Sequence, residues 1–127
     1  MTTLLTKADK PAVATDEFLL RAADYINEHG WIQNRLNGFD GSVCALGALY
    51  KVEEQLKDEG LRYHQIHPAF IGALNKLENT VHGTIPKWND APTRTKKQVI
   101  HAFYDAAGVP EASIAKPWYK RIFSRKK

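Results

Sequence analysis

The sequence predicts a small all-α domain of four helices, and three observations carry this prediction. Apolar residues recur at the three- and four-residue spacing of amphipathic helices in four separate segments. A glycine followed by a hydrophobic residue, a combination that ends helices, occurs at Gly30, Gly60 and Gly108. No segment alternates long enough to build a sheet. A chain of 127 residues has room for one domain with one modest core.

The first helix is expected over residues 15–29. Thr15 is the expected N-cap, and the two acidic residues that follow it suit the positive end of the helix dipole. The apolar face comprises Phe18, Leu19, Ala22, Ala23 and Ile26. Gly30 is expected to end the helix in the left-handed conformation, with Trp31 packed against the last turn.

A turn-rich segment and a second helix follow. The composition of residues 32–42 predicts a compact loop or a short hairpin with its tip at Asp40 and Gly41. Ser42 is the expected N-cap of a helix over residues 43–59. The start of this helix is apolar on all sides, so it is the expected central element. Its small side chains are expected to let a neighbouring helix approach closely.

The third helix is expected to begin at Pro68, because proline favours the first helical position, and to end at Gly83. Residues 84–92 contain two prolines and predict a structured crossing loop. Thr95 and Gln98 then form a capping box. This box begins a fourth helix that extends to about residue 107, and a short helix or turn is expected near the C-terminus.

Charge and composition divide the chain into three parts. Residues 1–14 lack periodicity and predict a mobile N-terminal arm, and residues 15–115 form the expected helical domain. Residues 116–127 hold six basic and no acidic side chains, whereas the preceding 115 residues hold 12 basic and 14 acidic ones. The positive net charge is therefore a property of this basic, aromatic C-terminal tail.

Composition also narrows the class of protein. A single cysteine fits a reducing compartment. The longest apolar run has eight residues, which is too short to span a bilayer. We therefore expect a cytoplasmic protein without membrane contact. No phosphate-binding loop or paired-carboxylate motif occurs. His64 and His67 have no cysteine or acidic partner nearby in sequence. We therefore expect no cofactor and no metal.

Cys44 is a weak candidate for catalysis. It falls in the opening turn of the second predicted helix, where the dipole lowers a thiol pKa below its free value of about 8.5. A cysteine nucleophile also needs a histidine, and His82 with Asn89 or Asp90 would complete a triad. The apolar residues on both sides of the cysteine favour the alternative of a buried structural thiol.

Trp88, Asn89 and Asp90 are the second candidate, as a binding site in the crossing loop. Either these residues form a recognition surface, or Trp88 fills the core while the two polar side chains bond the backbone of their own loop. The second interpretation is preferred, and Trp31 and Trp88 are both expected to be largely buried.

The C-terminal tail is the third candidate. Its hydrophobic residues are spaced as one face of a short helix with basic residues between them. Docking of Trp118 and Ile122 on the body is preferred, nucleic-acid binding is the next interpretation, and binding of a membrane or a partner helix is the third. The candidate binding residues of this tail are Lys116, Trp118, Lys120, Arg121 and Arg125.

Three motifs in order support a family resemblance. They are Gly30-Trp31, then Gly41-x-x-Cys44-Ala45-x-Gly47-Ala48-Leu49, then Ile85-x-x-Trp88-Asn89-Asp90 followed by Thr95. This arrangement, over roughly residues 16–107, resembles a family of small uncharacterised bacterial and bacteriophage domains. Ser42 stands where many members carry a basic residue. The resemblance implies a shared fold and a phage or mobile-element setting, and it supplies no catalytic residue.

These observations lead to three functional hypotheses. The first is a non-enzymatic protein that binds a macromolecule, with a protein as the expected partner and a phage-type accessory or host-interaction role. The second is nucleic-acid binding through residues 116–127. The third is a hydrolase or transferase that depends on Cys44.

Overall fold

The structure is a computed structural model that describes residues 13–109, and its architecture is all-α as the sequence predicts. The predicted C-terminal tail and most of the predicted N-terminal arm lie outside the described residues. Within them, five helices follow one another: α1 (Thr15–His29), α2 (Ala45–Asp58), α3 (Tyr63–Val81), α4 (Ile85–Asn89) and α5 (Lys96–Ala107).

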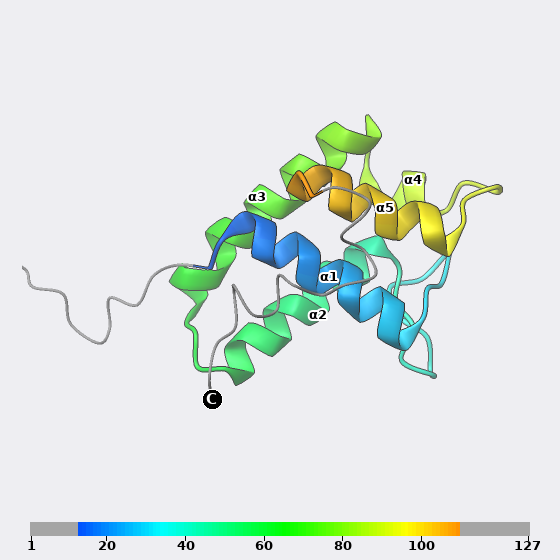
Figure 1. The fold of residues 1–127 in the computed structure, drawn as a ribbon. Helices are drawn as coiled ribbons and strands as arrows, with labels where there is room; N and C mark the ends of the chain where they lie inside the picture. Colours follow the sequence, from blue (N-terminus) through cyan, green and yellow to red (C-terminus); the bar gives the residue numbers. More distant parts are fainter. Residues whose placement is uncertain (1–12, 110–127) are drawn as a thin grey trace, which may run out of the picture.

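Helix α1 lies at the centre of the arrangement, because it packs against α2, α3 and α5 (Figure 1). Its predicted apolar face is buried throughout, from Phe18 to Ile26. Helix α2, expected to be central, lies to one side and leaves Tyr50 42% exposed. The periodicity of α1 therefore identified its buried face correctly, while the uniformly apolar start of α2 overstated the burial of that helix.

Both ends of α1 differ in detail from the prediction. The N-cap is Ala14, and Thr15 begins the helix without capping it. A Cβ atom placed on Gly72 of α3 would lie 2.8 Å from Thr15 Oγ1, so the Thr15 side chain occupies the crossing of α1 and α3. Gly30 ends the helix with a φ of 103°, but its ψ of 164° lies outside the left-handed helical region. Its carbonyl accepts from Val43 N at 3.1 Å, which ties the helix end to the next loop.

The α1–α2 loop, residues 30–44, is compact and contains two isolated bridges but no strand. Ser42 does not cap α2, because its hydroxyl donates to Asp40 Oδ1 at 2.6 Å. The N-cap is Cys44, whose Sγ accepts from Gly47 N at 3.3 Å. Helix α2 therefore begins two residues later than predicted. At its far end, Leu61 N donates to the carbonyl of Leu56 at 3.0 Å, which confirms the predicted stop.

Helix α3 begins five residues before the predicted start and includes Pro68. Gln65 Oε1 accepts from Arg62 N at 2.8 Å, so a capping interaction forms one turn ahead of the proline. Pro68 is the sixth residue of α3, so its missing N–H removes the bond that this position would donate to the carbonyl of His64. At the other end the left-handed residue is His82, with φ 59° and ψ 43°, and not Gly83.

The predicted crossing loop contains the short helix α4, with Pro86 in its first turn. Residues 90–95 then lead into α5, where the predicted capping box is confirmed. Thr95 Oγ1 accepts from Gln98 N at 3.2 Å, and Gln98 Oε1 accepts from Thr95 N at 3.1 Å. The helix ends as expected at Gly108, which has a φ of 74°.

A charged network ties α1 to the end of α2. Arg21 donates to Glu17 at 3.0 Å and to both carboxylate oxygens of Glu59 at 2.7 and 3.0 Å. Glu17 is only 2% exposed. Burial by itself would lower the pKa of Arg21, but the bonds and charges of the two carboxylates raise it above its ordinary value. The guanidinium therefore stays charged where two helices meet.

Candidate functional site

Asn89, at the end of α4, joins three segments of the molecule. Its side chain is 0% exposed. Its Oδ1 accepts from Trp31 Nε1 at 2.7 Å and from Ala45 N at 3.0 Å, the first backbone N–H of α2. Its Nδ2 donates to the carbonyl of Ile32 at 3.2 Å and to Asp90 Oδ1 at 3.0 Å. This one amide therefore fixes α4 to the α1–α2 loop and to the start of α2.

Two neighbouring side chains complete this attachment. Asp90 Oδ1 accepts from Asn34 N at 2.8 Å, and Gln33 Nε2 donates to the carbonyls of Asn89 and Ala91 at 3.0 and 2.8 Å. We expected Asn89 and Asp90 to bond the backbone of their own loop. They instead bond the backbone of the α1–α2 loop, more than 50 residues earlier in the chain.

Trp88 is half-buried, and Arg94 lies against its ring. The guanidinium of Arg94 lies 4.1 Å from its ring centroid, and Arg94 Nε donates to the Trp88 carbonyl at 2.9 Å. Trp31 is half-buried as well, and both indoles pack against the core. Both tryptophans therefore contribute to packing, while part of each indole stays exposed.

Cys44 is buried, in agreement with the preferred interpretation of a structural thiol. Burial raises its pKa, the hydrogen bond from Gly47 N opposes that rise, and the charge of Asp90 adds to it. The expected lowering of the pKa by the helix dipole is therefore outweighed by desolvation. The thiol borders a cavity of about 230 Å³. Its other lining residues are Asn34, Arg35, Leu36, Pro86 and Asp90.

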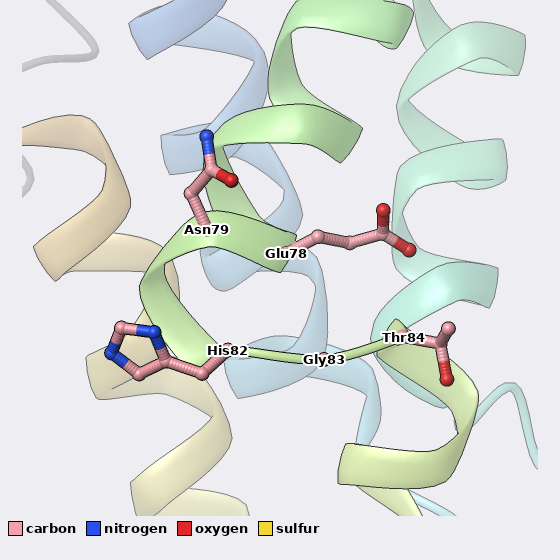
Figure 2. Close-up of a pocket in the computed structure, with 5 residues that line it drawn as sticks. All are labelled: Glu78, Asn79, His82, Gly83 and Thr84. Atoms are coloured by element: carbon pink, nitrogen blue, oxygen red, sulfur yellow. The ribbon is translucent and has the colours of Figure 1, made fainter.

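His82 does not join Cys44 and Asp90. It lies at the end of α3 and borders a different pocket of about 360 Å³. The side chains around this pocket diverge: His82 points toward α5, while Glu78 and Asn79 extend in other directions (Figure 2). No histidine lines the Cys44 cavity. A Cys44–His82–Asp90 triad is therefore not assembled.

His67, considered above as a metal ligand, stacks on Tyr63 with ring centroids 4.7 Å apart. Among residues 13–109, no three His, Cys, Asp or Glu side chains lie close enough together to hold a metal ion. No helix in that range combines the length and apolar character that a membrane span requires. The tail candidates, Lys116 to Arg125, lie outside the described residues.

The sequence interpretation missed the most exposed aromatic side chain of the described region. Phe39, at the tip of the α1–α2 loop, has a relative exposure of 103%, and Leu36 of the same loop is 46% exposed. The Arg35 guanidinium lies 5.8 Å from the Phe39 ring centroid. The position of this phenylalanine between Gly38 and Asp40 could have predicted its exposure. A hydrophobic residue inside a tight turn rarely reaches the core.

The fold and its loop define a small all-helical domain that displays an ordered apolar loop. The chain belongs to the family described as "Family of unknown function (DUF6197)", which matches residues 10–109. That match spans the whole described region. No curated protein and no solved structure matches the chain.

Proposed function

We propose that the chain is a non-enzymatic binding protein that contacts a protein partner through residues 34–41 of the α1–α2 loop. The observation that carries this proposal is the complete exposure of Phe39 on a loop that the hydrogen bonds of Asn89 and Asp90 hold in place. Burying an aromatic side chain of this size against a partner yields a large apolar contact that the isolated domain does not use.

The loop is ordered before it meets a partner. Leu36 O accepts from Cys44 N at 3.0 Å, and Gly38 N donates to Ser42 O at 2.8 Å. Each of these bonds joins the segment before the tip of the loop to the segment after it. Asp40 Oδ1 accepts from both the backbone N and the hydroxyl of Ser42. A loop fixed in this way loses little conformational freedom on association, so more of the contact energy appears as affinity.

The chemistry of the loop indicates the kind of partner. Phe39 and Leu36 supply apolar area, and Arg35 lies against the aromatic ring, a combination enriched in protein interfaces. The carboxylate of Asp40 is engaged within the loop. The expected partner surface is therefore an apolar pocket with acidic or hydrogen-bond-accepting groups at its rim, which would pair with Arg35.

The environment of Cys44 argues against an enzyme, and the family resemblance suggests the biological setting. A hydrolase or transferase would need a base for this thiol, and its cavity contains none of the chain's five histidines. The setting we propose is that of a phage-type accessory or host-interaction factor, in which a small domain acts by occupying a surface of another protein.

The test compares capture of proteins by the tagged full chain with capture by Phe39→Ala. We expect at least one protein to be retained at least tenfold less by the variant, since central interface aromatics contribute more than about 1.4 kcal/mol, a factor of ten. The retained protein is then purified and titrated by calorimetry against both chains.

Tyr63→Ala is the matched control, because Tyr63 is also an exposed aromatic, 61% exposed, and lies on α3. Phe39→Ala should melt within about 4 °C of the parent chain, as expected for a surface substitution. Identical capture by the parent chain and Phe39→Ala would reject the loop as the binding site. Loss of capture in Tyr63→Ala alone would move the site to α3.

A further inference from the structure

A row of four stacked rings crosses from α3 to α2 on a surface separate from the α1–α2 loop. Tyr63 stacks on His67 at 4.7 Å between centroids, His67 lies 6.2 Å from Phe70, and Phe70 stacks on Tyr50 at 5.5 Å. The interplanar angles are 18°, 19° and 23°. Phe70 also meets Phe18 of α1 edge-on, so the row is anchored in the core.

This row leaves much apolar area uncovered. Tyr63 is 61% exposed and Tyr50 is 42% exposed, while Ile71, adjacent to Phe70 in sequence, is 38% exposed. Together with Leu36 and Phe39 of the α1–α2 loop, these are the exposed large hydrophobic residues of the described region. A surface of this kind indicates a contact that residues 13–109 do not themselves supply.

The charges of the body favour a basic occupant. Residues 13–109 hold 12 acidic and 10 basic side chains. One turn beyond Tyr50 on α2 lie Glu53 and Glu54, and only Glu54 is paired, with Lys51 at 3.6 Å. An aromatic surface that binds nucleic acid is combined with a positively charged groove, which this composition does not provide.

We propose that this aromatic row is the docking site of the chain's own C-terminal tail. Residues 110–127 carry six basic side chains and one acidic one, and a helical spacing there places Trp118 and Ile122 on one face. The tail thus supplies apolar side chains that can cover the exposed rings and a positive charge that complements the acidic body. This proposal is independent of the partner proposed for residues 34–41.

The length of the tail permits this contact. Helix α5 packs on α1 and α3 and ends beside both of them (Figure 1). The eight residues from 110 to 117 reach up to about 26 Å when extended. A helix of 19 residues such as α3 is itself about 28 Å long. Trp118 can therefore reach most of the surface of α3 from the end of α5.

The first experiment places a photo-crosslinking amino acid at position 63 in the full chain and maps the crosslinked peptides by mass spectrometry. Crosslinks into residues 117–125 of the same chain are expected, with none from position 39. An equal mixture of ¹⁴N- and ¹⁵N-labelled chains identifies the source of each crosslink. Mixed-isotope crosslinks would show a second copy at the row and overturn the proposal, as would crosslinks that avoid the tail.

The second experiment is a double-mutant cycle on the melting temperature. Trp118→Ala should lower it by several degrees, since each 1 kcal/mol corresponds to about 4–8 °C in a domain of this size. In the Tyr63→Ala background that drop should shrink to less than half, and in the Phe39→Ala background it should be unchanged. Equal drops in all three backgrounds, or no drop in the parent chain, would refute docking on the row.

Discussion

At the scale of single residues, Asn89 is the buried polar side chain that ties α4 to the α1–α2 loop and to the start of α2. It is fully buried, and its amide makes four hydrogen bonds, to Trp31 Nε1, Ala45 N, Ile32 O and Asp90 Oδ1. Two of these groups, Ala45 N and Ile32 O, belong to backbone segments more than 40 residues away. The geometry of the exposed loop is therefore set by a residue of α4.

Asn89→Ala should lower the free energy of unfolding by about 2–4 kcal/mol, because it leaves buried donors and an acceptor without partners. Denaturant unfolding monitored by circular dichroism measures the loss. The matched control is Asn79→Ala, which removes an exposed amide on α3 and should change stability by less than about 0.5 kcal/mol. Equal effects of the two substitutions would contradict the role assigned to Asn89.

Cys44 gives a prediction about pH. Burial raises the thiol pKa in the folded protein, so the unfolded chain loses its proton first as the pH rises. The folded state then binds more protons than the unfolded state, and stability must fall above the unfolded thiol pKa of about 8.5. Cys44→Ser does not titrate in this range, and its hydroxyl can still accept from Gly47 N.

The difference in unfolding free energy between the parent chain and Cys44→Ser should therefore be constant from pH 7 to 8 and should shift against the parent chain above about pH 8.5. Urea unfolding of both proteins at each pH measures it. A thiol reagent near neutral pH should label the parent chain only after unfolding. Rapid labelling of the folded protein would restore the nucleophile hypothesis.

At the scale of secondary-structure elements, Gly47 explains how closely the α1–α2 loop approaches α2. A Cβ atom at this position would overlap the carbonyl oxygen of Leu36 and lie 3.1 Å from the carbonyl carbon. Both atoms belong to the backbone and cannot rotate away. The small residues of α2 were expected to admit a neighbouring helix, but at Gly47 they admit the loop.

Gly47→Ala should therefore destabilise the protein by about 1–3 kcal/mol, as overpacking does. This sign is opposite to the gain of up to about 1 kcal/mol that alanine normally gives over glycine in a helix. Thermal unfolding detects the difference. Gly83→Ala is the control, since a Cβ there meets nothing within 4 Å. A stabilised Gly47→Ala protein would show that the loop moves freely away from α2.

The elements also show what local sequence determines. The buried face of α1, the capping box of α5 and the stop at Gly108 followed from spacing and helix-end chemistry within one stretch of chain. The N-cap of α2 did not, because the groups that fix the loop come from Asn89 and Asp90, far along the chain. Pairings of that kind leave no periodic signal.

The candidate site was foreseen only in part for the same reason. Trp-Asn-Asp was recognised as a structured motif, but its partner segment was not, since the bond to Ile32 depends on the tertiary arrangement. The exposed Phe39 was open to prediction from its place in a turn. The exposure of Tyr63 could not be predicted, because the sequence predicts that α3 begins at Pro68, whereas α3 begins at Tyr63.

At the scale of the whole molecule, the uneven distribution of charge is the dominant feature. The sequence has a pI of about 9.2, yet residues 1–115 carry more acidic than basic side chains. Polyanion binding by this protein would therefore be a property of its last twelve residues. Such binding does not by itself distinguish a nucleic-acid function from nonspecific attraction of a basic tail.

Trp118→Ala separates these cases on immobilised nucleic acid. If Trp118 docks on the body, its ring does not stack on bases and the attraction to phosphate comes from the six basic side chains alone. Retention at low salt should then persist in this variant and disappear on deletion of residues 116–127. Retention should fall with salt with a log–log slope no steeper than about −5, the limit set by six basic side chains. If retention instead depends strongly on Trp118, the ring stacks on bases, and the tail is a nucleic-acid-binding element.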